Sequence, residues 1–165
     1  MFKEITAKEL KDNIISMIAD EYMLITAGDE NAHNMMTASW GFAGEIWGGD
    51  SVLALVRPQR YTMEFIDKQD YFTLSFYGEN KDIHKVCGFK SGRDLNKTEV
   101  CGLTPIYSDN AVYFEEARVV LICKKQYVDR MKEECFVDKD PIKWYKNADY
   151  HYMIIGKIEK VLIKE

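Results

Sequence analysis

The apolar positions of this chain fall mostly in short runs bounded by turn residues, a pattern typical of β-strands. Residues 36–47 form one extended segment, and the turn sequence Gly48-Gly49-Asp50 joins them to the next strand as a β-hairpin. The length of the later apolar-rich runs predicts strands that bend around a closed sheet. Strands are predicted over residues 22–27, 51–57, 71–77, 111–115, 118–128 and 152–164.

Helical spacing is confined to three stretches. A T-x-x-E capping box precedes an amphipathic pattern over residues 7–20. Pro58 suits the first position of a helix over 58–68, and Asn80 is a suitable cap for a helix that ends near residue 89. Because few strands are separated by full helices, a doubly wound parallel sheet is disfavoured. We expect a mainly β protein, a small antiparallel barrel with peripheral helices.

Length and charge narrow the function classes. The 165 residues fit a single domain over 1–165 that buries a core without disulfides. The net charge of -5 argues against nonspecific nucleic-acid binding, which relies on basic surface. No apolar run follows the first residues, so we expect no signal peptide, and no stretch approaches the length of a membrane span. The expectation is a cytoplasmic protein that binds neither nucleic acid nor membrane.

The four cysteines include no C-x-x-C pair, so a zinc site is disfavoured and free thiols are expected. His84 and Cys87 share one face of the third predicted helix at i,i+3, a spacing that can hold a metal ion. The favoured interpretation is an exposed histidine beside a buried cysteine, and no metal site is predicted.

Residues 34–40, Asn-Met-Met-Thr-Ala-Ser-Trp, combine an amide, two hydroxyls and an indole. Such a segment at a strand start can offer hydrogen bonds to a flat heterocycle, with an aromatic side chain beside it. The alternative is a polar loop that leads into a strand whose Trp40 belongs to the core. Composition alone favours this alternative.

Two basic segments are candidates for an anion site. Arg57, Arg60 and Thr62 lie at a predicted helix N-terminus, where free N–H groups and the helix dipole favour anions. Arginine adds forked hydrogen bonds to phosphate, and two arginines at this end of a helix are best explained by an anion between them. Residues 90–97, Lys-Ser-Gly-Arg-Asp-Leu-Asn-Lys, form a second basic loop. Taken alone, each segment is better explained by side chains that are solvated at the surface, whereas the two segments together indicate an anion-binding site.

Acid–base catalysis has only weak candidates. Asp149 could orient His151, although a surface histidine at a strand start is the favoured interpretation. Glu115 and Glu116 are adjacent, so on a strand they face opposite sides. The chain contains no G-x-G-x-x-G, Walker A or G-x-S-x-G motif. No catalytic residue is predicted.

Several strings, in order along the chain, resemble those of the flavin reductase-like family. Residues 34–40 are similar to its N-x-M-T-A-S-W signature. The resemblance spans roughly residues 20–160 and is strongest to the flavoredoxin-like branch. The later strings are R-P-x-R-Y-T at 57–62, S-G-R-D at 91–94 with Lys97, G-L-T-P at 102–105, F-E-E-A at 114–117, and D-Y-H at 149–151 before Ile155-Gly156.

The resemblance implies a split β-barrel that holds FMN noncovalently near a homodimer interface. The isoalloxazine ring would be lined by Asn34, Thr37, Ser39 and Trp40, with Ala38 also in the FMN-binding set. The ribityl phosphate would be faced by Arg57, Thr62, Ser91 and Lys97. Further candidates for FMN contact are Arg60, His151 and Arg93.

The implied function is that of an FMN-dependent oxidoreductase, in which the flavin carries the chemistry and the protein supplies position and electrostatics. It would be a flavin reductase that takes hydride from NADH or NADPH, or a flavoredoxin-like carrier that passes electrons to a partner protein. No acid–base residue is strictly required for either. The alternative is a non-catalytic flavin-binding or storage protein.

Overall fold

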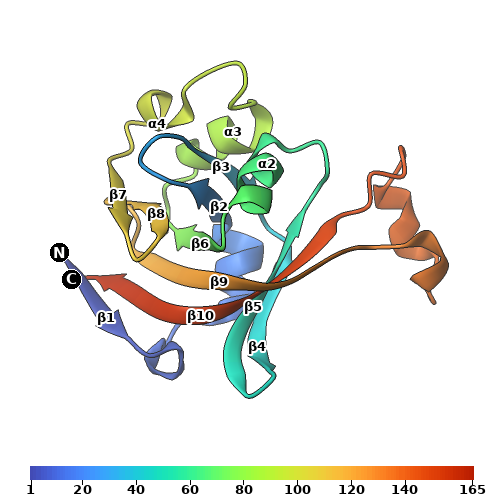
Figure 1. The fold of residues 1–165 in the computed structure, drawn as a ribbon, viewed down its shortest axis with the longest axis horizontal. Coiled ribbons are helices and arrows are strands. Elements are labelled where there is room, and N and C mark those ends of the chain that lie inside the picture. Colours follow the sequence, from blue (N-terminus) through green and yellow to red (C-terminus); the bar gives the residue numbers. More distant parts are fainter.

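The fold is built on an eight-stranded antiparallel sheet (Figure 1). The computed structural model describes residues 1–165. Its elements are β1 (Phe2–Ile5), α1 (Ile14–Ser16), β2 (Met23–Gly28), β3 (His33–Ala38), β4 (Gly41–Ile46), β5 (Gly49–Val56), α2 (Tyr61–Lys68), β6 (Tyr71–Phe76), α3 (Asp82–Phe89), α4 (Lys97–Val100), β7 (Pro105–Ser108), β8 (Ala111–Phe114), β9 (Val119–Arg130) and β10 (Tyr152–Lys164). The order in the sheet is β3-β2-β6-β9-β10-β5-β4, and β1 also pairs with β10. The mainly β class predicted from sequence is confirmed.

The two longest strands, β9 and β10, carry the sheet around the core. The first part of β10 pairs with β5 over residues 152–157, and its last part pairs with β1 over residues 161–164. The register of β10 with β9 shifts between Ile155 and Gly156, and such irregularities bend a strand. At Gly156 a Cβ would lie 2.6 Å from the Phe72 ring, so glycine lets this ring pack across the strand. The expectation of bent strands is confirmed.

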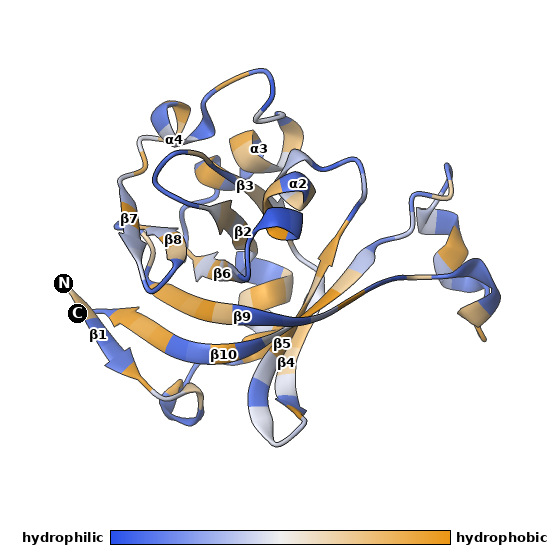
Figure 2. Ribbon diagram, in the orientation of Figure 1, coloured by the Kyte–Doolittle hydropathy of each residue, from blue (hydrophilic) through white to orange (hydrophobic).

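Apolar side chains form two clusters on opposite faces of the sheet. Along β9, Val119 and Leu121 belong to one cluster and Val120 and Ile122 to the other, as the alternation of side chains on a strand requires. Helix α2 packs on the first cluster, and α3 with the β7-β8 hairpin packs on the second. Burial on both faces explains why the first part of β9, residues 119–123, is an unbroken apolar run, whereas its exposed second half is mostly polar (Figure 2).

The helix predicted over residues 7–20 is wrong as a single element. The carboxylate of Glu9 accepts hydrogen bonds from the Thr6 backbone N–H at 2.8 Å and hydroxyl at 2.7 Å, but this capping box begins only a 3₁₀ turn over Ala7–Glu9. The chain is extended at Leu10. A new helix then begins because the Asn13 side chain accepts the N–H groups of residues 15 and 16, and it ends in a π-helical turn over Met17–Glu21.

Other boundaries also differ from those expected. Helix α2 begins at Tyr61 rather than at Pro58, because residues 57–60 form a turn closed by the Arg60 N–H and the Arg57 carbonyl at 3.1 Å. The loop over residues 90–105 contains the short helix α4, whose N-terminus is capped by the Asn96 side chain. The edge strands β1 and β7 carry too few apolar residues to be predicted. No helix of the structure is long and apolar enough to cross a membrane.

Residues 131–150, named here the arm, connect β9 to β10 and project away from the barrel (Figure 1). The arm carries 3₁₀ turns over Glu133–Cys135 and Asp140–Trp144. Three aromatic rings pack inside it, with ring centroids 4.8 Å apart for Tyr145 and Tyr150 and 5.7 Å apart for Phe136 and Tyr150. The arm therefore has a small core of its own, next to the start of β10.

Candidate functional site

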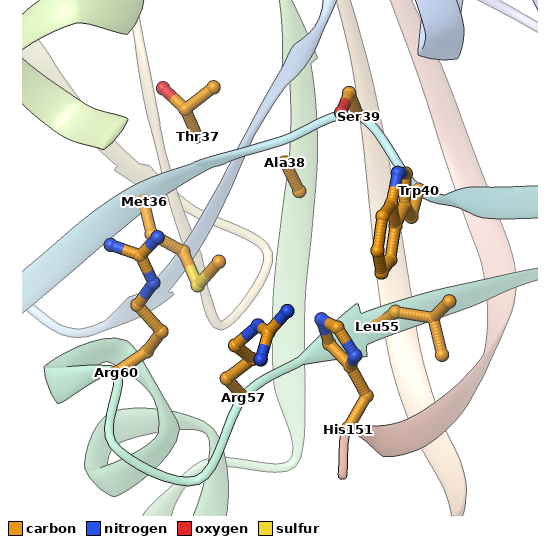
Figure 3. A pocket seen from close by; sticks show the side chains of 9 residues that line it. All are labelled: Met36, Thr37, Ala38, Ser39, Trp40, Leu55, Arg57, Arg60 and His151. Atoms are coloured by element: carbon orange, nitrogen blue, oxygen red, sulfur yellow. The ribbon is translucent and has the colours of Figure 1, made fainter. Parts of the chain in front are cut away.

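The segment expected to be one strand over residues 36–47 is two strands, β3 and β4, separated by Ser39 and Trp40. The two strands lie at opposite ends of the sheet order, because β3 pairs with β2 and β4 pairs with β5. The crossover at Ser39 and Trp40 therefore bridges the two margins of the sheet. A cavity of about 160 Å³ opens beside it (Figure 3), lined by Met36, Thr37, Ala38, Ser39, Trp40, Leu55, Arg57, Arg60 and His151.

A second cavity, of about 330 Å³, adjoins the first and shares Met36, Arg57 and Arg60 with it. The two form one elongated site with a first end at the crossover and a second end at α2 and the loop over residues 90–97. The second cavity is lined by Asn34, Met36, Arg57, Gln59, Arg60, Tyr61, Thr62, Phe89, Lys90, Ser91, Gly92 and Lys97.

The structure brings the FMN-binding residues predicted from sequence together in this elongated site, with the exception of Arg93, which lines neither cavity and forms an ion pair with Glu64. Their contact with a ligand stays a prediction. Sequence reasoning missed three apolar lining residues, Met36, Leu55 and Phe89, which carry no polar signal. It also missed Gln59, Tyr61, Lys90 and Gly92, although these lie inside the basic segments and strings singled out from the sequence.

Trp40 lies at the mouth of the first cavity. Its side chain is 37% exposed, so the alternative of a core tryptophan is wrong. The ring centroid is 5.2 Å from that of His151 and 5.8 Å from that of Trp144 in the arm. The neighbouring Thr37 points away from the other lining side chains (Figure 3), and its hydroxyl lies 3.1 Å from Nδ1 of His84. Thr37 therefore offers the cavity its backbone rather than its hydroxyl.

Two histidines expected at the surface are buried. His84 and His151 are 5% and 6% exposed. Burial, with a smaller effect of nearby cationic side chains, lowers the pKa of each to about 4, so both are neutral at pH 7. Nδ1 of His151 lies 2.9 Å from the Tyr145 hydroxyl, so a tyrosine of the arm orients this ring rather than Asp149. The expectation for His151 was wrong because Tyr145 at the base of the arm packs against it, a contact that no local sequence pattern shows.

Arg57 fastens the arm to the end of β5. Its Nη1 donates to the Asp149 carboxylate at 2.5 Å, and its Nη2 donates to the Trp144 carbonyl at 3.0 Å. Gln59 donates to the same carboxylate at 2.7 Å, and these contacts hold the pKa of Asp149 below its usual value. The charge of Arg57 is therefore already neutralised within the chain. Of the two arginines that the sequence places around one anion, only Arg60 lacks an acidic partner.

The second end of the site holds two cations that are shielded from solvent and lack counter-ions, beside the exposed Lys90. Arg60 donates to the Gly88 carbonyl at 2.8 Å, and Lys97 donates to the carbonyls of Met35 at 2.9 Å and Cys87 at 3.2 Å. Neither side chain forms an ion pair. Burial is the main cause that lowers the pKa of both. An ammonium has three donors, so Lys97 keeps one hydrogen for a ligand.

Close packing holds the second end together. The buried amide of Asn34 donates to the Thr62 hydroxyl at 2.8 Å, which joins β3 to the start of α2. A Cβ at Gly92 would lie 2.0 Å from Oδ1 of Asn34, so the backbone of the 90–97 loop approaches as closely as only glycine permits. Ser91 lines the cavity in the same loop, and its hydroxyl accepts the Arg93 N–H at 3.2 Å.

Comparison with known proteins places this geometry in a family. The model of the flavin reductase like domain matches residues 15–165. No curated protein matches the chain at a significant level. A flavoredoxin from Methanosarcina acetivorans has a similar structure, at 18% identity and a TM-score of 0.70, over 88% of this chain and 69% of that chain.

Two further structures show the same fold at low identity. An FMN-binding protein from Thermus thermophilus, solved with bound p-hydroxybenzaldehyde, is 16% identical, with a TM-score of 0.69 over 99% of this chain and 82% of that chain. An NADH:FAD oxidoreductase of Streptomyces globisporus, in complex with NAD and FAD fragments, is 12% identical, with a TM-score of 0.66 over 87% and 74%.

Proposed function

This chain belongs to the flavin reductase-like family, and we propose that it binds FMN noncovalently in the elongated site and works as an oxidoreductase. The split-barrel fold of that family, predicted from the sequence strings, is confirmed. The phosphate is assigned to the second end of the site, from here called the phosphate end. The flavin ring is assigned to the first end, from here called the ring end.

The observation that carries the proposal is the pair of cations without counter-ions, Arg60 and Lys97. An unpaired buried charge is costly, and a nearby anion offsets that cost. A phosphate monoester carries between one and two negative charges at pH 7 and offers three acceptor oxygens. Lys97 has one free donor and Arg60 has several, so the donors present fit this group.

The ring end fits a flat, largely apolar group. Met36, Ala38 and Leu55 supply apolar walls, and Trp40 closes one side with its indole. When bound, the flavin accepts hydride and passes electrons on. The chain contributes position: Trp40 and the backbone of residues 37–39 bound the space in which a donor would lie against the ring. His151 stays neutral at pH 7, held by Tyr145, so it shapes this space without acting as an acid.

Replacing Lys97 tests the assignment of the phosphate end. We expect Lys97→Met to weaken FMN binding about tenfold or more, because a hydrogen bond to a charged group contributes roughly 1.5–3 kcal/mol. Riboflavin has no phosphate, so its affinity should change little. Lys85→Met is the matched control, because Lys85 is exposed, pairs with Asp82 and lines neither cavity.

Both affinities are measured by quenching of flavin fluorescence on titration, with thermal unfolding as the check on folding. If Lys97→Met fails to fold, Arg60→Met serves as the second variant. Equal losses for FMN and riboflavin would show that these cations do not face the phosphate. No binding of FMN by the parent protein would refute the proposal as a whole.

We propose NADH or NADPH as the electron donor. The proposal is supported by the family and by the exposed mouth of the ring end, where Trp40 is 37% and Trp144 is 57% exposed. The test is steady-state oxidation of each nucleotide with FMN. In folded, FMN-saturated variants, Trp40→Ala should lower turnover more than His151→Ala does, because positioning and not proton transfer limits the reaction. The opposite order would assign a proton-transfer role to His151.

A flavoredoxin-like electron carrier is the second candidate, favoured by the similarity to the flavoredoxin from Methanosarcina acetivorans. It predicts bound FMN that a partner protein reduces, with no oxidation of either nucleotide. A non-catalytic storage protein would bind FMN but would reduce no acceptor protein. Photoreduction of the holoprotein followed by mixing with acceptor proteins separates these two.

We further propose that the protein is a cytoplasmic homodimer. Large apolar side chains lie exposed on the β4-β5 hairpin, where Phe42 is 68% and Trp47 is 63% exposed, and β4 is an edge strand. A second copy that covers this hairpin would bury both. Light scattering should give about twice the chain mass of 19.2 kDa, and Phe42→Glu should shift it toward the monomer. A parent that is monomeric with FMN bound would refute the dimer.

A further inference from the structure

Two cysteines meet behind the phosphate end of the site. Cys87 lies in α3 and Cys101 follows α4, 14 positions later, and their sulfur atoms are 3.8 Å apart. Both are free thiols. A disulfide bond is about 2.0 Å long, so the two sulfur atoms must come about 1.8 Å closer for the bond to form. The other two cysteines, Cys123 on β9 and Cys135 in the arm, are not part of this contact.

The segment between the two cysteines is the loop of the phosphate end. It contains Ser91, Gly92 and Lys97, all of which line the second cavity. Lys97 contacts the backbone of both cysteines, since its ammonium donates to the Cys87 carbonyl at 3.2 Å and its carbonyl accepts the Cys101 N–H at 2.9 Å. A bond between the two sulfurs would therefore tie the ends of this loop together directly behind Lys97.

The two thiols differ in access to solvent. Cys87 is fully buried, whereas Cys101 is partly exposed. Burial raises the pKa of the Cys87 thiol to about 12, so this thiol stays protonated and is shielded from an oxidant in solution. Cys101 is accordingly the thiol that an oxidant reaches first, and Cys87 is the thiol that resolves the product.

We propose that Cys87 and Cys101 form a redox-active dithiol that hydrogen peroxide converts to a disulfide, and that this bond holds the loop of the phosphate end closed on FMN. The second half rests on the function proposed above. In the first step the Cys101 thiolate attacks one peroxide oxygen, the O–O bond breaks, and Cys101 becomes a sulfenic acid as water is released. In the second step the Cys87 sulfur attacks the Cys101 sulfur, the S–O bond of the sulfenic acid breaks, and the Cys87 proton passes to the departing hydroxyl, which leaves as a second water. The two thiols together lose two electrons, and one hydrogen peroxide is reduced to two waters.

Closing the loop favours the bound state of the cofactor. The positions of Ser91 and Lys97 are already those of a site, and a bond between neighbouring sulfurs changes them little. It removes alternative loop conformations, and a site that is ordered before binding loses less entropy on binding. The oxidised protein should release FMN roughly threefold to tenfold more slowly than the reduced protein.

The test uses the full-length protein carrying Cys135→Ser, which removes the exposed thiol of the arm. Reduced protein is treated with a small excess of hydrogen peroxide, and intact mass and alkylation mapping follow the thiols. We expect the loss of two hydrogens, a peptide cross-link between Cys87 and Cys101, and full recovery with dithiothreitol. Cys123 is fully buried and should stay reduced, as an internal control. Cys101→Ser and Cys101→Ala, checked for folding by thermal unfolding, should give no cross-link.

Release of FMN is then timed by stopped flow for the reduced and oxidised forms, with riboflavin in parallel. If Cys87 and Cys101 stay available to alkylation, the dithiol is refuted. If the cross-link forms and FMN leaves at the same rate or faster, the effect on the loop is refuted. If neither form binds FMN, the proposed function fails together with the second half of this proposal, while the mass measurement decides the first half by itself.

Discussion

A methyl group added at Gly92 tests how the phosphate end is built. The added Cβ would lie 2.0 Å from Oδ1 and 2.9 Å from Cγ of Asn34, and 3.2 Å from the Tyr61 ring. Contacts this short force a movement: either the Asn34 amide turns, or the 90–97 loop moves away. If the amide turns, it loses the 2.8 Å hydrogen bond to Thr62, which lies in a buried environment.

The size of the effect follows from these contacts. Overpacking of this kind costs about 1–3 kcal/mol, and a buried hydrogen bond left unmade costs a similar amount. The chain relaxes by whichever route is cheaper, so Gly92→Ala should lower the free energy of unfolding by about 1–3 kcal/mol and Tm by roughly 3–10 °C. A loop that moves takes Ser91 and Lys97 out of position. Loss of one charged hydrogen bond then weakens FMN binding about tenfold or more.

Gly88→Ala is the matched control for Gly92→Ala. It lies four residues earlier, and its added Cβ would be 3.5 Å from Thr37, an ordinary contact. Alanine within α3 should leave Tm unchanged or raise it, because alanine is favoured over glycine in helices by up to about 1 kcal/mol. Thermal unfolding and FMN titration are measured for both variants.

A double variant isolates the clash. Asn34→Ala removes the oxygen that the new methyl group meets, so Gly92→Ala should add little in that background. The single Asn34→Ala variant serves as the reference, since it leaves the Thr62 hydroxyl without its partner. If Gly92→Ala has the same Tm and the same FMN affinity as the parent protein, the loop does not press on Asn34, and our account of the phosphate end is wrong.

Two further predictions concern the arm and the buried histidines. Asp149→Asn should lower Tm by roughly 2–6 °C and speed proteolytic cleavage within residues 131–150, because the Arg57–Asp149 ion pair fastens the arm. An unchanged rate of cleavage would show that other contacts hold the arm in place. The free energy of unfolding should be highest above about pH 6.5 and should fall as the pH drops toward 4. His84 and His151 have pKa values near 4 in the folded protein, so over this range the unfolded chain takes up protons first. Urea unfolding from pH 7 to pH 4 measures this loss; His151→Asn should make it shallower, and a flat profile in the parent would contradict it.

The strands were the part of the fold that the sequence could predict. β10 runs from residue 152 to residue 164, as expected, because apolar residues mark both of its ends, at 152–155 and at 161–163, and each end carries a buried side chain, Ile154 or Val161. The same reasoning failed at Ser39 and Trp40. The apolar pattern continues through them, and only the pairing partners of the backbone change from β2 to β5. Local patterns report extended conformation, but the partner of a strand depends on the whole topology.

The residues that line the site could be predicted from the sequence, whereas the pairing and burial of their charges could not. Every predicted residue except Arg93 lines one of the two cavities, because the segments that carry these residues lie at the ends of elements that meet there. The partner of Arg57 is 92 positions away in the arm, so no local signal could show that its charge is already neutralised. Lys97 reads as an exposed loop lysine, and only the packing of α4 against α3 makes it a buried cation.

The two ends of the site rest on different elements, so their contributions to binding can be separated. The phosphate end is held by β3, α2 and the 90–97 loop, whereas the ring end is held by the crossover at Trp40, the end of β5 and the arm. Lys97 and Trp40 share no hydrogen-bond partner and line different cavities. Effects at sites without shared partners usually add within about 0.5 kcal/mol.

Lys97→Met should therefore change the ratio of FMN to riboflavin affinity, and Trp40→Ala should weaken the binding of both ligands equally. The double variant should show the sum of the two losses for FMN. A coupling of about 1 kcal/mol or more would mean that the ends close as one unit, and the phosphate and ring assignments would then need to be measured together.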